Sequence, residues 1–327
     1  MRRGSRGRGP ASPVAALDLG TNNCRLLIAV PGRGGNLRIV DSFSRIVRLG
    51  EGVGQSGLLG EAALTRTVAA LKICAEHLRA RGVRRLRAVA TEAARRAGNA
   101  DVLLARARDE AGIELEIISA EEEARLAAVG CAPLIDPAAQ GALIFDIGGG
   151  STEIIWMRRD GGGAPGVVVS SSEPAGVVTL AESWGGGAFD AAGYARLRGE
   201  MRERFGAVKA RMDATAALDV GAHHLLGTSG TVTTLAAIAL RLPRYDRGKV
   251  DATWHRCADI LAVADRLAAL DLAGRAAIGA VGPDRADLIV PGCAIFAAIR
   301  DLWPCERLRV ADRGLREGML RELLAPR

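Results

Sequence analysis

Two short stretches of the chain combine an acid with a turn of small polar residues. The first, DLGTNN, ends an apolar run and places Asp18 two residues before Gly20. The second, DIGGGSTE, places Asp146 two residues before Gly148 and adds Glu153 after the turn. In both stretches the chain then resumes as an apolar strand. This repeated layout predicts a duplicated unit, with the two turns facing one another across a cleft.

Turns of this composition are suited to phosphate. Gly, Ser, Thr and Asn direct backbone N–H groups into a small space that binds anions, and glycine lets the backbone approach without a Cβ atom. A duplicated fold whose turns simply require glycine is the alternative. The expected phosphate-binding residues are Gly20, Thr21, Asn22, Asn23, Cys24 and Arg25 in the first turn, and Gly148, Gly149, Gly150, Ser151 and Thr152 in the second.

The acids beside these turns predict a metal site. A carboxylate at a strand end is costly unless it meets a cation or a donor. Mg²⁺ prefers one or two carboxylates together with waters and substrate phosphates. We expect Asp146 and Glu153 to hold Mg²⁺, with Asp18 as a further candidate ligand and Mn²⁺ as the alternative ion. No organic cofactor is expected.

Three more stretches carry candidate residues. In ISAEEEARL, Ser119 and Glu122 fit a capping box and Glu121 suits the start of a helix, which leaves Glu123 as a candidate general base. Arg95, in VATEAARRAGN, is a candidate phosphate ligand, and a solvent-exposed helix face is the alternative. The stretch GTSGT is typical of an anion or nucleotide loop at a helix start, and its residues are Gly227, Thr228, Ser229, Gly230 and Thr231.

The composition excludes several classes of protein. The net charge of +7 depends largely on four arginines in the first ten residues. The sequence has no basic patch interleaved with aromatic residues, so it does not indicate a nucleic-acid partner. No apolar run is long enough for a membrane span. Six scattered cysteines without a C-x-x-C pair indicate reduced thiols and a cytoplasmic location.

Apolar periodicity predicts alternating strands and helices, which is typical of an α/β fold with a largely parallel sheet. Two prolines and a glycine in 131–141 predict a domain boundary. The last helix, from about residue 313, is a candidate to pack back on the first lobe. The predicted segments are a disordered basic tail (1–13), a first lobe (14–131) and a second lobe (132–327).

Taken together, these motifs resemble the exopolyphosphatase / guanosine-pentaphosphate phosphohydrolase family, which shares the superfold of the actin-like ATPases. RADLIVPGCAIF and VADRGLREGML also match it, so that the resemblance runs from about residue 14 to residue 322. It implies two actin-like, ribonuclease H-like lobes with duplicated βαβ cores and an interlobe cleft.

The resemblance also implies an activity, namely hydrolysis of the terminal phosphates of inorganic polyphosphate with Mg²⁺ and an activated water. Glu123 would be the base, Asp146 and Glu153 would position the metal, and Arg95 and the two turns would hold phosphates. The alternatives are a pppGpp or nucleoside-triphosphate phosphohydrolase, a non-catalytic sensor of polyphosphate or (p)ppGpp, and a sugar kinase. We expect a homodimer.

Two departures from the family pattern bear on the substrate. The family commonly has Ser-Asn-Ser where this chain has Thr21, Asn22 and Asn23. Longer relatives add a C-terminal helical domain after the second lobe, so we expect this chain to favour short polyphosphate or a nucleotide.

Overall fold

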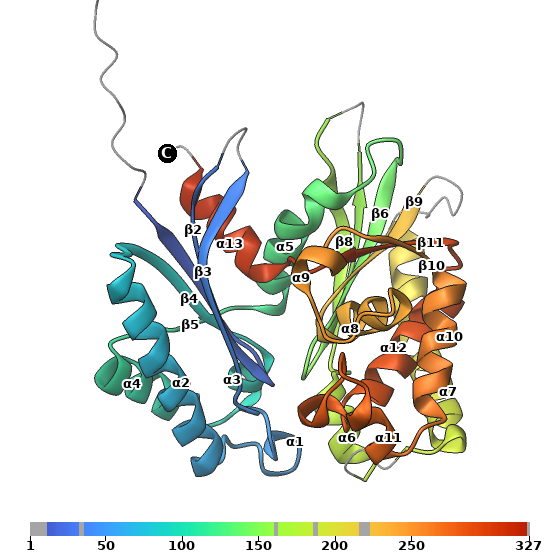
Figure 1. Cartoon of the computed structure of the whole chain (residues 1–327), viewed down its shortest axis with the longest axis horizontal. Helices are drawn as coiled ribbons and strands as arrows, with labels where there is room; N and C mark the ends of the chain where they lie inside the picture. The colour runs from blue at the N-terminus through green and yellow to red at the C-terminus, as the bar shows by residue number, and fades with distance from the viewer. Residues whose placement is uncertain (1–11, 33–35, 160–162, 186–188, 216–222, 326–327) are drawn as a thin grey trace, which may run out of the picture.

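The structure is a computed structural model, and it describes residues 12–32, 36–159, 163–185, 189–215 and 223–325. Residues 1–11 of the predicted basic tail lie outside this range. The described chain forms two lobes side by side, each built on one sheet with helices against it (Figure 1).

The first lobe holds a five-stranded sheet in the order β3-β2-β1-β4-β5. Its strands are β1 (Val14–Leu19), β2 (Asn23–Pro31), β3 (Leu37–Ile46), β4 (Arg85–Ala90) and β5 (Glu116–Ile117), and its helices are α1 (Val53–Ser56), α2 (Glu61–Ala80), α3 (Glu92–Arg96) and α4 (Ala100–Ala111). Leu17 and Leu19 of β1 belong to the core that these helices help to form, whereas Val14 and Ala16 pack against the last helix of the chain. Because both faces are covered, β1 is an almost continuous apolar run.

The second lobe holds a six-stranded sheet in the order β10-β11-β9-β6-β7-β8. Its strands are β6 (Gly141–Ile147), β7 (Thr152–Arg158), β8 (Gly166–Glu173), β9 (His223–Thr228), β10 (Trp254–Arg256) and β11 (Arg307–Ala311). The helices after β8 are α6 (Val177–Ser183), α7 (Ala191–Thr215), α8 (Gly230–Ala239), α9 (Arg247–Val250), α10 (Cys257–Ala268), α11 (Leu272–Ala277) and α12 (Ile289–Leu302). Most of them pack on one face and form the largest core of the molecule.

The two sheets share one topology, which confirms the predicted duplication. In each, the first strand pairs antiparallel with the second, and the second pairs antiparallel with the third. The first strand also pairs in parallel with a later strand, β4 in one lobe and β9 in the other. The two acid-containing turns therefore lie in equivalent hairpins: one joins β1 to β2, and the other joins β6 to β7.

Two helices lie between the sheets, α5 (Ala120–Cys131) and α13 (Leu315–Leu324). Helix α5 packs on the second sheet, although it precedes the predicted boundary at residue 132, and α13 packs on β1 of the first lobe. The helices approach closely at glycines, since a Cβ atom on Gly318 would lie 2.0 Å from the carbonyl oxygen of Leu126. Each lobe thus sends one helix across to the other sheet.

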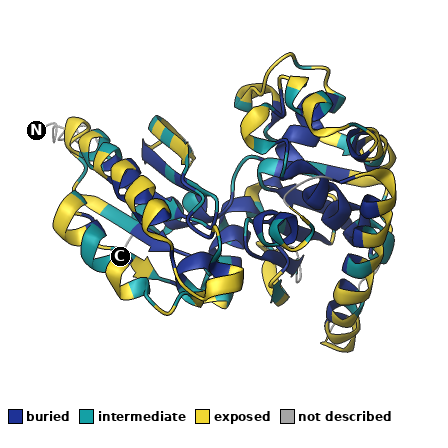
Figure 2. Cartoon of the chain, turned by 90° about the horizontal axis from the view of Figure 1, so that it is seen from below, coloured by how far each residue is buried: buried dark blue, intermediate teal, exposed yellow. Residues whose placement is uncertain are grey.

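Figure 2 shows the resulting distribution of burial, with buried strands inside each lobe and exposed helix faces outside. Within the described part of the chain, no helix is long and apolar enough to cross a membrane.

Candidate active site

The first turn joins β1 to β2. The amide of Gly20 donates to the carbonyl of Asn23 at 2.9 Å, which closes the turn. Thr21 is buried, and its methyl group occupies the space beside Gly50, where an added Cβ atom would approach it to 2.3 Å. Asp18, the residue before the last of β1, pairs in register with Arg25 of β2. The turn therefore holds one carboxylate and one guanidinium side by side.

The second turn joins β6 to β7 in the same way. The amide of Gly148 donates to the carbonyl of Ser151 at 2.8 Å. Asp146 pairs in register with Glu153, so the position that holds Arg25 in the first hairpin holds a second acid here. One oxygen of Glu153 accepts hydrogen bonds from the hydroxyls of Ser151 (2.7 Å) and Ser172 (2.8 Å).

The two turns touch one another across the cleft. A Cβ atom on Gly149 would lie 2.9 Å from Cβ of Thr21, and one on Gly150 would lie 2.7 Å from the Thr21 hydroxyl. Gly176 in turn packs on the backbone of Gly149, where a Cβ atom would approach to 2.3 Å. The glycines are therefore required by the contact between the lobes, in addition to any approach to a ligand.

A cavity of about 130 Å³ lies between the lobes at these turns; we call it the catalytic cavity. It brings together most of the residues predicted as a site. Those that line it are Asp18, Gly20, Thr21, Asn22, Asn23, Arg25, Glu123, Asp146, Gly148, Gly149, Gly150, Ser151, Glu153, Ser229, Gly230 and Thr231.

Four of the carboxylates that line this cavity have pKa values raised by burial. The pKa of Asp146 rises to about 7 through burial and the neighbouring Glu153. Burial also raises the pKa of Asp18 and Glu153, and it raises that of Glu123 well above the ordinary range, with Glu153 adding to the effect. So much buried negative charge is costly unless it faces a cation.

The donor set fits Mg²⁺. No described residue donates a hydrogen bond to the carboxylate of Asp18 or Asp146, although both are partly buried at the cavity. Within the described residues no cluster of three or more His, Cys, Asp or Glu side chains is arranged as a complete metal site. Mg²⁺ does not need one, because it commonly keeps waters and takes phosphate oxygens as ligands.

Glu123 lies in the first turn of α5, and its position depends on Arg95. Ser119 caps the helix by accepting from the amide of Glu122, as predicted. The Glu122 carboxylate does not complete the capping box, because it pairs with Arg87 and Arg125. A guanidinium nitrogen of Arg95 donates to Glu123 Oε2 at 3.1 Å and to the carbonyl of Ile118 at 2.8 Å.

Arg95, predicted as a phosphate ligand, has its guanidinium on carboxylates in this structure. It also donates to Glu92 at 2.7 Å, and it does not line the catalytic cavity. Its guanidinium donates hydrogen bonds to two carboxylates and one carbonyl, because α3 packs against the start of α5. In this structure Arg95 contacts Glu123 and Glu92 at the edge of the cavity.

Three other predicted residues, Cys24, Thr152 and Gly227, do not line the cavity. Cys24 is buried in the core of the first lobe, with its sulfur 4.0 Å from that of Cys74. The Thr152 hydroxyl donates to the carbonyl of Ala175 at 2.6 Å. Gly227 packs against the ring of Phe145, where a Cβ atom would approach to 2.6 Å. Side-chain alternation along β2 and β7 explains the placements of Cys24 and Thr152.

The GTSGT stretch is the junction between β9 and α8. Ser229 caps α8 with φ at 113°, a conformation that L residues rarely adopt. Such strain is commonly kept at functional sites. Thr228 does not line the catalytic cavity; its hydroxyl donates to the carbonyl of Arg313 at 2.7 Å.

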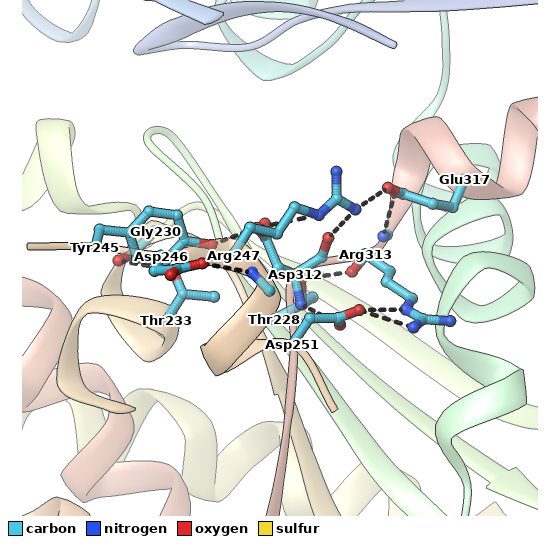
Figure 3. A network of polar contacts seen from close by, with 12 residues as sticks. Thr228, Gly230, Thr233, Tyr245, Asp246, Arg247, Asp251, Asp312, Arg313 and Glu317 are labelled. Atoms are coloured by element: carbon cyan, nitrogen blue, oxygen red, sulfur yellow. Dashed lines mark hydrogen bonds and ion pairs between the residues drawn. The ribbon is translucent and has the colours of Figure 1, made fainter. Parts of the chain in front are cut away.

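That contact belongs to a polar network that fixes the turn before α13 (Figure 3). Arg247 donates to the carbonyl of Asp312 and to Glu317, and the side chain of Arg313 pairs with that of Asp251. The amide of Gly314 donates to Glu317 at 2.9 Å. The network holds Gly314 beside Asp146, with a Cβ atom placed there lying 3.8 Å from Asp146 Oδ2.

Sequence reasoning missed several residues of the cavity wall. Glu92 and Arg285 line it, and no described residue accepts a hydrogen bond from the Arg285 guanidinium. Asn22 was predicted, but its buried side-chain oxygen has no donor within the described chain. The stretch RADLIV carried the signal for Arg285, although it did not indicate which residue faces the site.

The model of the Ppx/GppA phosphatase family matches residues 28–326. The chain belongs to this family. Exopolyphosphatase 2 of Mycobacterium tuberculosis is 34% identical over 321 residues, which cover 94% of this chain and 97% of that protein. The guanosine-5′-triphosphate,3′-diphosphate pyrophosphatase of Photobacterium profundum is 30% identical, over 97% of this chain and 61% of that protein.

Solved structures agree with the family assignment. The crystal structure of the Aquifex aeolicus member of the Ppx/GppA family aligns with a TM-score of 0.78 and 31% identity, over 96% of this chain and 98% of that one. The predicted family and its actin-like two-lobed fold are therefore confirmed.

Proposed function

We propose that this chain is a phosphoanhydride hydrolase that removes terminal phosphates from inorganic polyphosphate with Mg²⁺. One observation carries the proposal. Two phosphate-type turns and the carboxylates of Asp18, Glu123, Asp146 and Glu153 line one cavity between the lobes. The similarity to exopolyphosphatase 2 along nearly its whole length supports the same activity.

In the proposed reaction the terminal phosphate enters between the two turns, whose amides and hydroxyls hold its oxygens. Glu123 accepts a proton from a water molecule, and the water oxygen attacks the terminal phosphorus. The anhydride bond breaks, and its bridging oxygen remains on the shortened chain. Catalysis of this kind is mostly positioning and charge stabilisation.

Asp146 and Glu153, with Asp18 as a further candidate, would hold the metal ion. A bound Mg²⁺ would neutralise charge that develops on the phosphate oxygens. Arg95 would keep Glu123 in place and oppose the effect of burial on its pKa.

A second candidate substrate is pppGpp or another nucleoside triphosphate. The similarity to the pyrophosphatase of Photobacterium profundum favours it, and Ser229 and Gly230 at the cavity wall could face a nucleoside. The intact set of acids argues against a sensor without activity.

Phosphate release from tripolyphosphate, long polyphosphate, pppGpp and ATP, assayed side by side with Mg²⁺, tests the proposal. Release mainly from polyphosphate is expected. Release mainly from pppGpp would select the second candidate, and release from none of them would overturn the hydrolase.

A homodimer in the cytoplasm completes the proposal. All six cysteines lie in the described part of the chain and are free thiols, which suits a reducing compartment. Light scattering on the purified protein tests the dimer.

A further inference from the structure

A second cavity opens between the lobes, where the end of β3 faces the turn at 281–285. Its volume is about 750 Å³, and we call it the outer cavity. It shares Asn23 and Arg285 with the catalytic cavity, so the two adjoin. The catalytic cavity, at about 130 Å³, is much the smaller of the two. A polymer whose end reacts there must continue elsewhere, and the outer cavity is an adjoining space.

The outer cavity is basic. Its charged lining consists of Arg45, Arg48, Arg66 and Arg285 against Glu51 and Asp284. Two of these arginines hold the walls together. Arg66 pairs with Glu51 at 2.6 Å, and Arg48 crosses the cleft to Asp287 at 3.1 Å. An excess of positive charge in a concave site attracts polyanions.

The other two arginines are available to a ligand. No described residue forms an ion pair or a side-chain hydrogen bond with the guanidinium of Arg45 or of Arg285; Arg45 only lies over the ring of Phe43, 5.4 Å from its centre. Guanidinium groups bind phosphate oxygens bidentately.

The lining also bears on which polyanion fits. Among the described residues around the outer cavity, none is aromatic. A nucleobase would find no ring to stack on, whereas a phosphate chain needs only cations and hydrogen-bond donors.

We propose that the outer cavity is a distal subsite for inorganic polyphosphate, in which Arg45 and Arg285 hold phosphates behind the one being cleaved. The proposal rests on the proposed function and deepens it. Affinity should then depend on chain length, because tripolyphosphate fills the catalytic cavity first and only longer chains reach Arg45.

Binding isotherms of length-defined polyphosphates test this with full-length protein. Glu123→Gln is the background, so that the chain is not consumed, and tripolyphosphate is compared with chains of about 15 phosphates. Arg45→Glu should raise the Kd of the longer chain about tenfold, because it removes a phosphate ligand. It should also reduce the salt dependence of that binding by about one charge contact. The Kd of tripolyphosphate for the Arg45→Glu protein should stay within about twofold of its Kd for the background protein.

Arg38→Glu is the matched control. Arg38 is an exposed arginine on the same strand, β3, and it lines neither cavity. The same charge reversal there should leave both chains unaffected. Equal effects of the two substitutions would point to general electrostatics and overturn the subsite.

The remaining outcomes separate this inference from the proposed function. An Arg45→Glu protein that binds long and short chains as the background does would overturn the subsite alone. If pppGpp is measured in the same way and only its binding is weakened by Arg45→Glu, the outer cavity serves a nucleotide and the subsite is overturned as well. If the long chain binds through Arg45 but wild-type protein releases no phosphate from it, the hydrolase fails and the subsite stands.

Discussion

At the scale of single residues, the site sets buried acids against very few positive charges. Asp18, Glu123, Asp146 and Glu153 all have raised pKa values through burial. Arg95 is the guanidinium that contacts Glu123 directly. Both the protonation of the acids and their ability to hold a cation should therefore respond to single substitutions.

The role of Arg95 can be tested through the pH dependence of kcat. The charge of Arg95 lowers the pKa of Glu123 against the effect of burial, so Arg95→Gln should raise that pKa. Because the base must be ionised, the acidic limb of the kcat profile should move to higher pH. KM for polyphosphate should stay within about twofold, since Arg95 does not line the cavity.

Arg95→Lys retains a positive charge and should restore part of the profile. If KM instead rises strongly while the pH profile stays in place, Arg95 is a phosphate ligand, as the sequence alone suggested.

Asp146 gives a prediction for stability in the absence of divalent metal. Its pKa is about 7 in the folded protein against 3.8 in the unfolded chain. The folded state therefore holds a proton that the unfolded chain releases, and stability should fall as the pH rises from about 4 to about 7. Asp146→Asn should raise Tm more at pH 8 than at pH 4.

Mg²⁺ should raise Tm of wild-type protein at pH 8 and should do so much less for Asp146→Asn. Thermal unfolding with and without Mg²⁺ measures both effects. An equal response of the two proteins to Mg²⁺ would refute Asp146 as a metal ligand.

At the scale of elements, the crossing of α5 and α13 connects the two lobes. The contact depends on glycine, because Gly318 lies against the backbone of Leu126 and Gly130 against that of Gly314. Two helices that touch at their backbones have no room to add even one carbon atom without separating.

Gly318→Ala should therefore destabilise the protein by about 1–3 kcal/mol, since it overpacks this contact. Gly199→Ala is the matched control, because Gly199 lies on an exposed helix face with nothing within 4 Å of an added Cβ atom. It should stabilise by about 0.5–1 kcal/mol through helix propensity. Urea unfolding measures both. A gain in stability for Gly318→Ala would contradict the packing described here.

Some features of these elements could be predicted from the sequence, and others depend on tertiary packing. The hairpins of Asp18 and Asp146 were predictable because their signals are local: an apolar run, an acid and a polar turn. The capping of α5 by Ser119 was local too. The pairing of Arg95 with Glu123 was not, because it depends on how α3 packs against α5. Nor was the strained backbone of Ser229, since its φ of 113° is imposed by the junction between β9 and α8.

At the scale of the whole molecule, neither lobe contains the site alone. The first lobe supplies Asp18 and its turn, the second supplies Asp146 and Glu153, and Glu123 comes from α5 between them. Among the described residues, the polar contacts across the rim include the pair of Arg48 with Asp287 and the hydrogen bond that Glu182 accepts from the amide of Gly52 at 3.0 Å. Partly exposed pairs of this kind contribute at most about 1 kcal/mol, so the polar contacts at the rim add little to the packing between the lobes at the two turns and at the α5–α13 crossing.

In the function proposed here, this shared cavity hydrolyses polyphosphate with Glu123 as the base. The most direct measurement compares phosphate release from polyphosphate with Mg²⁺ by wild-type protein, by Glu123→Gln and by Glu121→Gln, whose side chain is an exposed acid on the same helix turn. We predict that Glu123→Gln lowers kcat by about 100- to 10,000-fold and that Glu121→Gln leaves it unchanged. Turnover by Glu123→Gln within about tenfold of wild type would contradict the account.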